Sequence, residues 1–397
     1  MDDLEWISKA LELARQGTAL ASPNPLVGAL LVKDGRLIGQ GFHTYDGREH
    51  AEVRALQAAK AAAKAAEAKA DGAAALGATL YINLEPCCYQ GRTGPCTEAV
   101  LAAGVKRVVA AMPDPNPLVA GRGFEQLRQA GVEVETGLCR EQAERLNESF
   151  ARYIRTGMPL VTLKAGLTLD GKIAAPDDNS GWITSAEARE QVQQQRHAHD
   201  AILTGVGTVL ADDPLLTDRS GLPRRRPLLR VVMDSHLRIP LTAQMFERVE
   251  DDLLIFCAAS FDAGADAGAG DEKRKALERR GVEVVPLPPD EALNSRRPGL
   301  REAMKELGSR QITSVLMEAG SALNWAALEA GVADKVFLYY APKLLGGAES
   351  LPLAGGAGIR AMRDALPVEK IRLHHFGPDF AVEGYLHNIY GDISGRD

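Results

Sequence analysis

The stretch that decides the fold and the chemistry of this chain is residues 84–96, Leu-Glu-Pro-Cys-Cys-Tyr-Gln-Gly-Arg-Thr-Gly-Pro-Cys. The apolar run at 79–84 predicts a buried strand leading into it, and His50-Ala51-Glu52 opens a predicted helix upstream. Three of the chain's five cysteines, Cys87, Cys88 and Cys96, fall within ten residues here. Such a sparse, clustered set indicates a metal site or a catalytic thiol rather than a disulfide framework.

His50, Cys87 and Cys96 are the predicted ligands of a catalytic zinc ion. One imidazole and two thiolates suit zinc and leave a coordination position open, where bound water has a pKa of about 7. Glu52 lies two residues after His50, so it can move protons between water, substrate ring and leaving amine without binding the metal. A His-x-Glu motif followed by Pro-Cys and a second cysteine is typical of zinc deaminases.

The spacing of the second cysteine departs from the common signature, because eight residues rather than two separate Cys87 from Cys96. The intervening glycines and proline predict a tight loop, and Cys96 opens a predicted helix, whose positive end favours a thiolate. Cys88 competes for the metal, but adjacent side chains usually diverge, so we expect Cys96 to be the ligand. A closed structural site would need a fourth ligand, and Tyr89 and Gln90 are poor donors.

Length and composition predict a two-domain enzyme without nucleic-acid or membrane partners. A chain of 397 residues is about twice an ordinary domain. Its net charge of −7 argues against a protein that coats a nucleic-acid backbone. The first 17 residues predict an amphipathic helix rather than a secretory signal, and no apolar run approaches the roughly 18 residues of a membrane span. We therefore expect a cytoplasmic protein.

Helices and strands alternate along the first half, which predicts an α/β sandwich over residues 1–156. A turn at Lys33-Asp34-Gly35 predicts a hairpin, and an Ala-rich extension at 58–70 predicts an exposed end of the second helix. Gly157-Met158-Pro159 marks the expected boundary. The predicted strands are 26–32, 37–42, 79–84, 105–111 and 132–135, and the predicted helices are 1–17, 50–70, 97–103, 123–130 and 140–154.

The second half, residues 157–397, repeats this alternation. Glu318-Ala319-Gly320-Ser321 lies between a strand and an apolar helix at 322–330. The first amides of such a helix can hold a diphosphate, although on this evidence alone an ordinary β–α turn is the better explanation. Lys164 and Glu318 lie at strand ends, where α/β sheets bind ligands; either could instead be a salt-bridged surface group. The predicted strands are 160–165, 201–203, 228–233, 253–257, 282–287, 313–317 and 336–340, with helices at 185–197 and 272–280 and a low-complexity loop at 261–270.

Longer motifs extend over almost the whole chain, at 22–28, 50–53, 84–87, 91–96 and 114–123, and then at 163–171, 180–185, 208–217, 318–320 and 341–347. On these residues the sequence resembles the bifunctional riboflavin-biosynthesis deaminase–reductases of bacteria. That family usually has Ser-His-His or Ser-His-Tyr where this chain has Cys88-Tyr89-Gln90. The difference leaves the ligand assignment intact and affects only local substrate contacts.

The resemblance implies a cytidine-deaminase-like α/β/α sandwich followed by a dihydrofolate-reductase-like α/β domain. The first would deaminate 2,5-diamino-6-ribosylamino-4-pyrimidinone 5′-phosphate with Zn²⁺. The second would reduce the ribosyl side chain to ribityl with NADPH. The expected partner is this small phosphorylated pyrimidine, and a homo-oligomer is compatible with the sequence.

Site residues in the second half follow from the resemblance by position. Two substrate-binding arginines suit a phosphate, because guanidinium groups are bidentate donors. Leu167 replaces a smaller residue, so its contact should be through the backbone. The implied cofactor contacts are Leu167, Trp182, Thr208, Asp212, Ser235, Gly320, Ser321, Ala322, Leu323, Asn324, Trp325 and Ala326. The implied substrate contacts are Lys164, Ser180, Arg196, Leu216, Arg219 and Glu318.

Two points stay open at the level of sequence. In the first half, Asn24 and His43 are candidate pyrimidine contacts, but His43 could equally be structural. The competing hypothesis for the whole chain is a nucleic-acid base deaminase carrying a non-catalytic binding or oligomerisation domain. It would require a basic groove, which the acidic composition does not favour.

Overall fold

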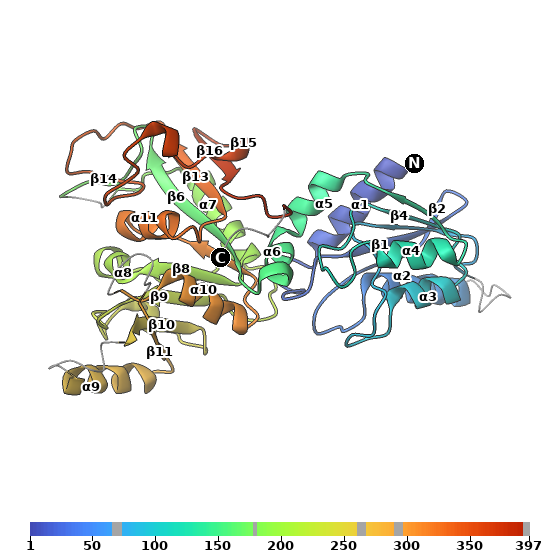
Figure 1. Ribbon diagram of the computed structural model, residues 1–397, viewed down its shortest axis with the longest axis horizontal. Helices are drawn as coiled ribbons and strands as arrows, with labels where there is room; N and C mark the ends of the chain where they lie inside the picture. Colours follow the sequence, from blue (N-terminus) through green and yellow to red (C-terminus); the bar gives the residue numbers. More distant parts are fainter. Residues whose placement is uncertain (66–73, 178–180, 260–266, 290–296, 392–397) are drawn as a thin grey trace. The chain divides into compact units, whose positions relative to one another are not determined.

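The computed structural model describes residues 1–65, 74–177, 181–259, 267–289 and 297–391. The chain divides into two compact units (Figure 1). Unit 1 is Met1–Thr156 with Pro223–Arg225, and unit 2 is Gly157–Leu222 with Arg226–Asp397.

Unit 1 is built on a five-stranded sheet of order β2-β1-β3-β4-β5. The first three strands in this order are antiparallel and the last three are parallel. The α1 helix packs on one face of the sheet, and α2 packs on the other with α3 beside it. The strands are β1 Gly28–Lys33, β2 Arg36–Phe42, β3 Thr79–Ile82, β4 Arg107–Ala110 and β5 Glu133–Thr136; the helices are α1 Asp3–Arg15, α2 Ala51–Ala65, α3 Cys96–Ala102, α4 Arg122–Gln129, α5 Arg140–Leu146 and α6 Glu148–Thr156.

The predicted hairpin is confirmed, with β1 and β2 joined at Asp34 and Gly35. Both residues have left-handed backbone angles, with φ values of 50° and 71°. Positive φ at both central positions gives a hairpin turn the twist of the strands that it joins. The sequence Asp-Gly supplies the two residue types that best tolerate it.

Two glycines let α2 lie directly against β2. A methyl group at Gly39 would collide with the Ala55 carbonyl oxygen and the Ala59 amide, and one at Gly41 would collide with the side chain of Arg54. Since His50 precedes α2 and Glu52 lies in its first turn, this close packing fixes where both functional side chains sit.

We expect Gly39→Ala to destabilise unit 1, because the added methyl meets backbone atoms that cannot rotate away. Overpacking of this kind costs about 1–3 kcal/mol. Denaturant unfolding followed by circular dichroism should show this loss of stability, and Lys60→Ala, an exposed position of the facing helix α2, is the control. If the denaturant concentration at the unfolding midpoint were unchanged in Gly39→Ala, α2 could move away from β2 without loss of stability.

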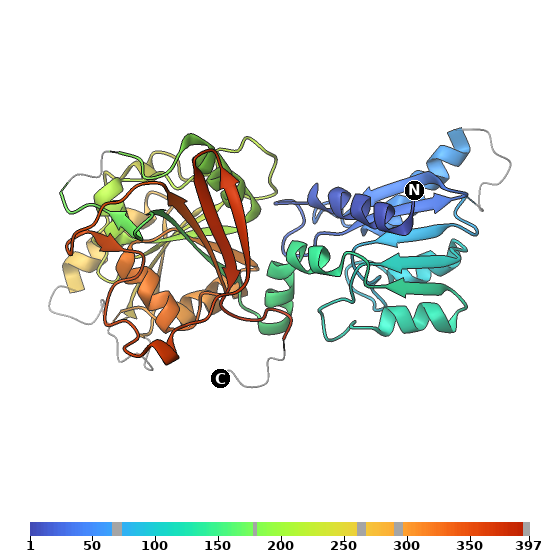
Figure 2. The same ribbon diagram turned by 90° about the horizontal axis from the view of Figure 1, so that it is seen from above.

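Unit 2 is built on a nine-stranded sheet of order β11-β10-β9-β8-β12-β6-β13-β16-β15. The seven strands from β11 to β13 in this order are parallel, and the hairpin β15–β16 closes one edge antiparallel (Figure 2). The strands are β6 Leu160–Thr168, β8 Ala201–Gly205, β9 Leu229–Met233, β10 Leu253–Ala258, β11 Glu283–Leu287, β12 Ser314–Met317, β13 Lys335–Ala341, β15 Glu369–Phe376 and β16 Asp379–Tyr385, with a separate pair, β7 Lys172–Ala174 and β14 Leu351–Pro352; the helices are α7 Ala186–Ala198, α8 Val206–Asp212, α9 Ala267–Glu278, α10 Leu300–Ser309 and α11 Ser321–Glu329.

The helices that follow the neighbouring strands β8 and β12 lie on opposite faces of this sheet. Val206 and Val209 of α8 pack in the core cluster that contains Ile202 of β8. Ala327 of α11 packs in the cluster that contains Leu203, the next residue of β8, whose side chain points to the other face. The carboxyl ends of β8 and β12 therefore form a topological switch point, where open α/β sheets bind ligands.

Most predicted elements are confirmed within a few residues, but two differ, and several observed elements were not predicted. The helix expected at 140–154 is two helices, because the buried Asn147 between them bonds both the amide and the carbonyl of Leu26. The predicted loop at 261–270 is wrong at its end, since α9 begins at Ala267; residues 260–266 lie outside the described ones. The hairpin β15–β16 was not predicted.

Two remaining expectations concern the Ala-rich extension of the second helix and the lack of a membrane-spanning segment. The Ala-rich helix continues to Ala65, and the rest of its expected extension lies outside the described residues. In the described part of the chain, none of the helices has the length and apolar character that crossing a bilayer requires.

Two candidate active sites

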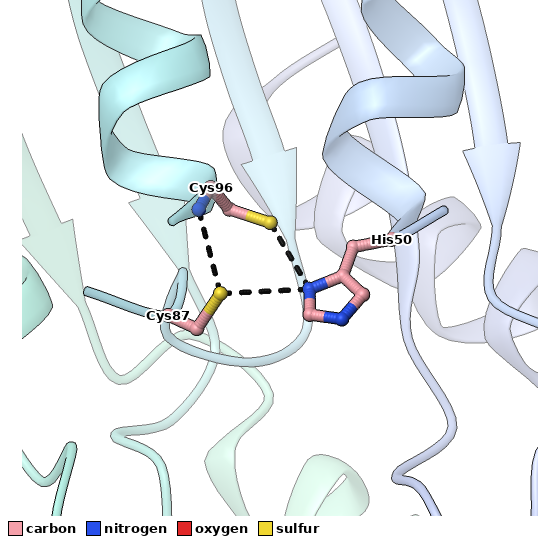
Figure 3. Close-up of side chains that lie close together, drawn as sticks. All are labelled: His50, Cys87 and Cys96. Atoms are coloured by element: carbon pink, nitrogen blue, oxygen red, sulfur yellow. Dashed lines mark hydrogen bonds between the residues drawn. The ribbon is translucent and has the colours of Figure 1, made fainter. Parts of the chain in front are cut away.

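His50, Cys87 and Cys96 converge at one point in unit 1 (Figure 3). The Nδ1 atom of His50 lies 3.1 Å from the Cys96 sulfur and 3.5 Å from the Cys87 sulfur. A tetrahedral zinc ion, with bonds of about 2.0 Å to nitrogen and 2.3 Å to sulfur, separates two such ligands by about 3.5 Å. The three side chains thus fit zinc in both donor type and spacing.

Three segments bring these ligands together. His50 directly precedes α2, Cys87 follows β3, and Cys96 is the first residue of α3. The backbone amide of Cys96 donates to the Cys87 sulfur at 3.4 Å, and the Thr93 hydroxyl lies 3.5 Å from Nε2 of His50. The loop from 88 to 95 therefore folds back so that its two end cysteines meet.

The two sulfurs carry unequal charge. Hydrogen bonds from the Cys96 thiol, from His50 and from the Cys96 amide lower the pKa of Cys87 to about 4. The pKa of the Cys96 thiol is raised, because it donates to Cys87 and is buried. The pKa shifts of the two thiols are therefore opposite in direction, and zinc binding requires both thiols to lose their protons.

The competing ligand Cys88 is not part of this cluster. Burial raises the pKa of its thiol, in contrast to the lowered pKa of Cys87. Within the described residues, the cluster at this point is the set that the sequence predicted, His50 with Cys87 and Cys96.

Glu52 is buried in the first turn of α2, with 3% of its surface exposed. Burial is the main cause that raises its pKa to about 7, and the negative charge on Cys87 adds to the effect. A carboxyl group with a pKa near neutrality can both accept and return a proton at physiological pH.

His43 and Asn24 lie beside the metal cluster. The His43 ring packs edge-on against His50, with centroids 5.3 Å apart. Its Nδ1 lies 3.0 Å from the Glu49 carbonyl oxygen and its Nε2 lies 2.9 Å from the Asn24 amide nitrogen, so one ring nitrogen donates and the other accepts. Burial lowers the pKa of His43 to about 4, which keeps the ring neutral.

A structural carboxylate that sequence reasoning missed is Glu85. Its two oxygens accept hydrogen bonds from the amides of Asp114, Gly121, Gly123 and Phe124 at 2.8–3.2 Å. Glu85 thereby fixes the loop 114–123 next to the cysteine loop. The only available signal was its position two residues before Cys87.

Most of the implied cofactor residues of unit 2 lie on the elements around the switch point. Thr208 and Asp212 lie on α8, Ser235 follows β9, and Gly320 caps α11. A Cβ atom built on Gly320 would lie 3.7 Å from the Thr208 hydroxyl oxygen, so α8 and the start of α11 are neighbours. The remaining α11 residues of this set, Ser321, Ala322, Leu323, Asn324, Trp325 and Ala326, form the first two turns of that helix.

Two buried polar atoms in these turns have no partner. They are the Ser321 hydroxyl and the Asn324 side-chain oxygen. The amides at the start of a helix point along its axis, and together with an unpartnered hydroxyl they suit an anionic group such as a diphosphate.

Lys164, Arg196 and Glu318 form one partly buried ion network. Arg196 binds the Glu318 carboxylate with Nε and Nη2 at 2.8 and 3.0 Å, and the Lys164 ammonium lies 3.2 Å from the same carboxylate. Burial alone would raise the pKa of Glu318, but the two cations outweigh it and lower the pKa to about 2. Lys164 and Glu318 are therefore partners, and Arg196 joins them from α7.

The other implied contacts differ in exposure. Trp182 is 70% exposed, whereas the Leu167 side chain is wholly buried, so only its backbone can reach a ligand. Leu216 is buried and Arg219 is exposed. Ser180 lies outside the described residues.

Comparison with known proteins places the chain in a family. A model of the RibD C-terminal domain matches residues 159–382, and a model of the cytidine and deoxycytidylate deaminase zinc-binding region matches residues 1–112. The riboflavin biosynthesis protein RibD of Actinobacillus pleuropneumoniae is 39% identical over 383 residues, which are 96% of this chain and 95% of that protein. The chain belongs to the RibD family. RibD of Escherichia coli is also 39% identical, over 96% of this chain and 98% of its own length.

Solved structures agree with this membership. RibD of Acinetobacter baumannii superposes with a TM-score of 0.79 at 36% identity, and the Thermotoga maritima diaminohydroxyphosphoribosylaminopyrimidine deaminase/5-amino-6-(5-phosphoribosylamino)uracil reductase with a TM-score of 0.77 at 32% identity. Each comparison covers 96% of this chain and 98% of the other. The predicted fold is confirmed: a cytidine-deaminase-like domain and a dihydrofolate-reductase-like domain. As a RibD protein, the chain is a bifunctional deaminase and reductase of riboflavin biosynthesis, using zinc and NADPH.

Proposed function

We propose that residues 1–156 deaminate 2,5-diamino-6-ribosylamino-4-pyrimidinone 5′-phosphate and that residues 157–397 reduce the ribosyl side chain of the product with NADPH. The observation that carries the proposal is the pairing of two separate sites on one chain. The cysteine–histidine cluster lies in unit 1 and the Lys164–Glu318–Arg196 network lies in unit 2. The expectation that the protein works in the cytoplasm stays a prediction.

In the deaminase half we assign zinc to His50, Cys87 and Cys96. Zinc, when bound, activates water for attack on the ring carbon that carries the amine. Glu52 takes a proton onto its carboxylate and returns it to the leaving amine, which its pKa of about 7 allows. Neutral His43, held by Asn24 and the Glu49 carbonyl, is placed to orient the pyrimidine.

In the reductase half we assign the diphosphate of NADPH to the start of α11, with Ser321, and its other contacts to Thr208, Asp212 and Ser235. The cofactor supplies the hydride. Lys164 is positioned by Glu318 to hold the sugar portion of the substrate at that hydride. Arg196 already donates three hydrogen bonds to Glu318 and the Thr217 carbonyl, so the substrate phosphate falls mainly to Arg219.

The direct test supplies purified protein with the diaminopyrimidinone substrate and NADPH and follows ammonia and NADPH oxidation together. We expect ammonia release without NADPH, and NADPH oxidation only after deamination has occurred. Ammonia release with no NADPH oxidation under any condition would support the competing hypothesis of a non-catalytic second domain.

We expect Lys164→Ala and Glu318→Ala to slow reduction while sparing ammonia release. Either change breaks the network, and removing Glu318 leaves two cations in a partly buried site without their carboxylate. The loss of kcat for reduction should be at least about 100-fold, as for other proton-handling or substrate-orienting groups. Both half-reactions are measured on each variant, with pre-deaminated substrate for the reductase. Equal losses in both would contradict separate sites.

A further inference from the structure

The loop 213–220, between α8 and β9, carries two of the proposed substrate contacts, Leu216 and Arg219. It contains no helix or strand, and two of its non-glycine residues have left-handed backbone angles: φ is 41° at Asp213 and 54° at Leu216. Such angles persist only where the surroundings hold them, and they gather at functional sites. What holds this loop therefore bears on substrate binding.

One end of the loop is held by packing. The Leu216 side chain is 4% exposed and lies in the core cluster that contains Val206 and Val209 of α8. The preceding carbonyl, of Leu215, accepts a hydrogen bond from Arg230 at 3.3 Å. These contacts fix the loop up to Leu216 but leave residues 217–220 to be held by something else.

The last two turns of α7 hold those residues. Arg196 donates to the Thr217 carbonyl at 3.0 Å, and the Gln193 side-chain oxygen accepts from the Arg219 amide at 3.0 Å. Between these two bonds, Nδ1 of His197 lies 3.0 Å from a carboxylate oxygen of Asp218. Three consecutive loop residues are thus each bonded to one side chain of the same helix.

The His197–Asp218 pair is the buried one of these three contacts between α7 and the loop. Both side chains are only 6% exposed. A carboxylate can only accept, so the geometry places a proton on Nδ1 of His197. The other oxygen of Asp218 accepts from the Ser220 amide at 2.9 Å, so one carboxylate links α7 to both sides of Arg219.

Arg196, next to His197, also binds Glu318 through two hydrogen bonds. The contacts between α7 and the loop 217–220 are therefore continuous with the Lys164–Glu318–Arg196 network. We infer that His197 and Asp218 are positioning residues of the reductase site, which fix the 217–220 loop so that Arg219 meets the substrate phosphate. This inference rests on the proposed function of unit 2. It predicts weaker substrate binding, with little change in the hydride-transfer step or in cofactor binding. The reason is that neither residue lies on α8 or α11, to which the cofactor contacts are assigned.

The test is a double-mutant cycle on the full chain with His197→Ala, Asp218→Ala and the double variant. For each we would measure NADPH affinity by cofactor fluorescence, and KM and kcat with the deaminated phosphoribosylamino-uracil. We expect each single variant to raise KM about tenfold, the equivalent of one hydrogen bond to a charged group, with kcat and NADPH affinity within about twofold of the parent. The double variant should be no worse than the worse single one, because the two residues act as a pair.

Two further variants sharpen the result. Asp218→Asn keeps one acceptor oxygen, which can serve His197 or the Ser220 amide but not both, so its KM should lie between those of the parent and of Asp218→Ala. Gln194→Ala removes an exposed side chain of the same helix and should change nothing. Since unit 2 must be folded to bind NADPH, retained cofactor affinity separates positioning from unfolding.

The outcomes are distinct. An unchanged KM in Asp218→Ala would overturn the positioning role, and so would a loss of NADPH affinity as large as the loss of substrate affinity. Strict additivity in the double variant would also overturn it, because the residues would then act separately. If the unaltered chain fails to oxidise NADPH with the deaminated substrate, the proposed function itself falls, and the inference falls with it.

Discussion

Glu52→Gln is expected to abolish ammonia release while the protein stays folded and retains zinc. The amide has nearly the same shape as the carboxyl group but cannot shuttle a proton between water, ring and leaving amine. General acid–base groups contribute about 10²- to 10⁴-fold, and Glu52 serves both directions of transfer, so we expect a loss of about 10³-fold or more in kcat. Its burial and its pKa of about 7 are what suit it to the task.

Reduction of pre-deaminated substrate should be nearly unchanged in Glu52→Gln, which makes the second activity an internal control on the same molecule. Zinc content, measured by atomic spectroscopy, reports whether the ligand set His50, Cys87 and Cys96 stays intact. Near-normal ammonia release would remove Glu52 from the mechanism. Loss of reduction with normal zinc and folding would show that the two sites are coupled or shared.

The second large effect is expected from the cysteines. Purified protein should hold about one zinc ion per chain, and Cys87→Ser or Cys96→Ser should lose most of it together with deamination. A serine hydroxyl is not deprotonated near neutral pH as a thiolate is, so the ligand set falls from three to two. The Cys87 substitution also replaces the sulfur that accepts from the Cys96 amide with a smaller hydroxyl oxygen.

Cys88→Ser is the matched control, because it changes a neighbouring cysteine that lies outside the cluster. We expect this variant to keep its zinc and its deaminase activity. Full zinc in Cys96→Ser, or loss of zinc in Cys88→Ser, would overturn the assignment of the ligands.

Sequence alone was sufficient where the relevant interactions are local or chemically restrictive. The hairpin at Asp34 and Gly35 could be predicted because few residues tolerate its backbone angles. The set His50, Cys87 and Cys96 could be predicted because few side chains bind zinc and leave a position open. The alternation of helices and strands likewise indicated two α/β halves before any contact was known.

The sequence did not predict the outer hairpin β15–β16 or the helix break at Asn147. The β15 strand faces outward along most of its length, and its alternation of Ile371 and Leu373 with polar residues is too short to mark it as a strand. The break at Asn147 depends on hydrogen bonds to Leu26, more than a hundred residues earlier. No pattern confined to residues 140–154 contains that information.

The reductase site shows most clearly which features the sequence predicts and which depend on tertiary contacts. The sequence placed Lys164 and Glu318 at strand ends but left each as either a ligand contact or a surface ion pair. Only the pairing of β6 with β12 sets these residues side by side, and only the packing of α7 brings Arg196 to the same carboxylate. Strand order and helix packing arise from contacts between residues far apart in the chain. The types of functional group were therefore determined by the sequence, and their partners were decided by the tertiary structure.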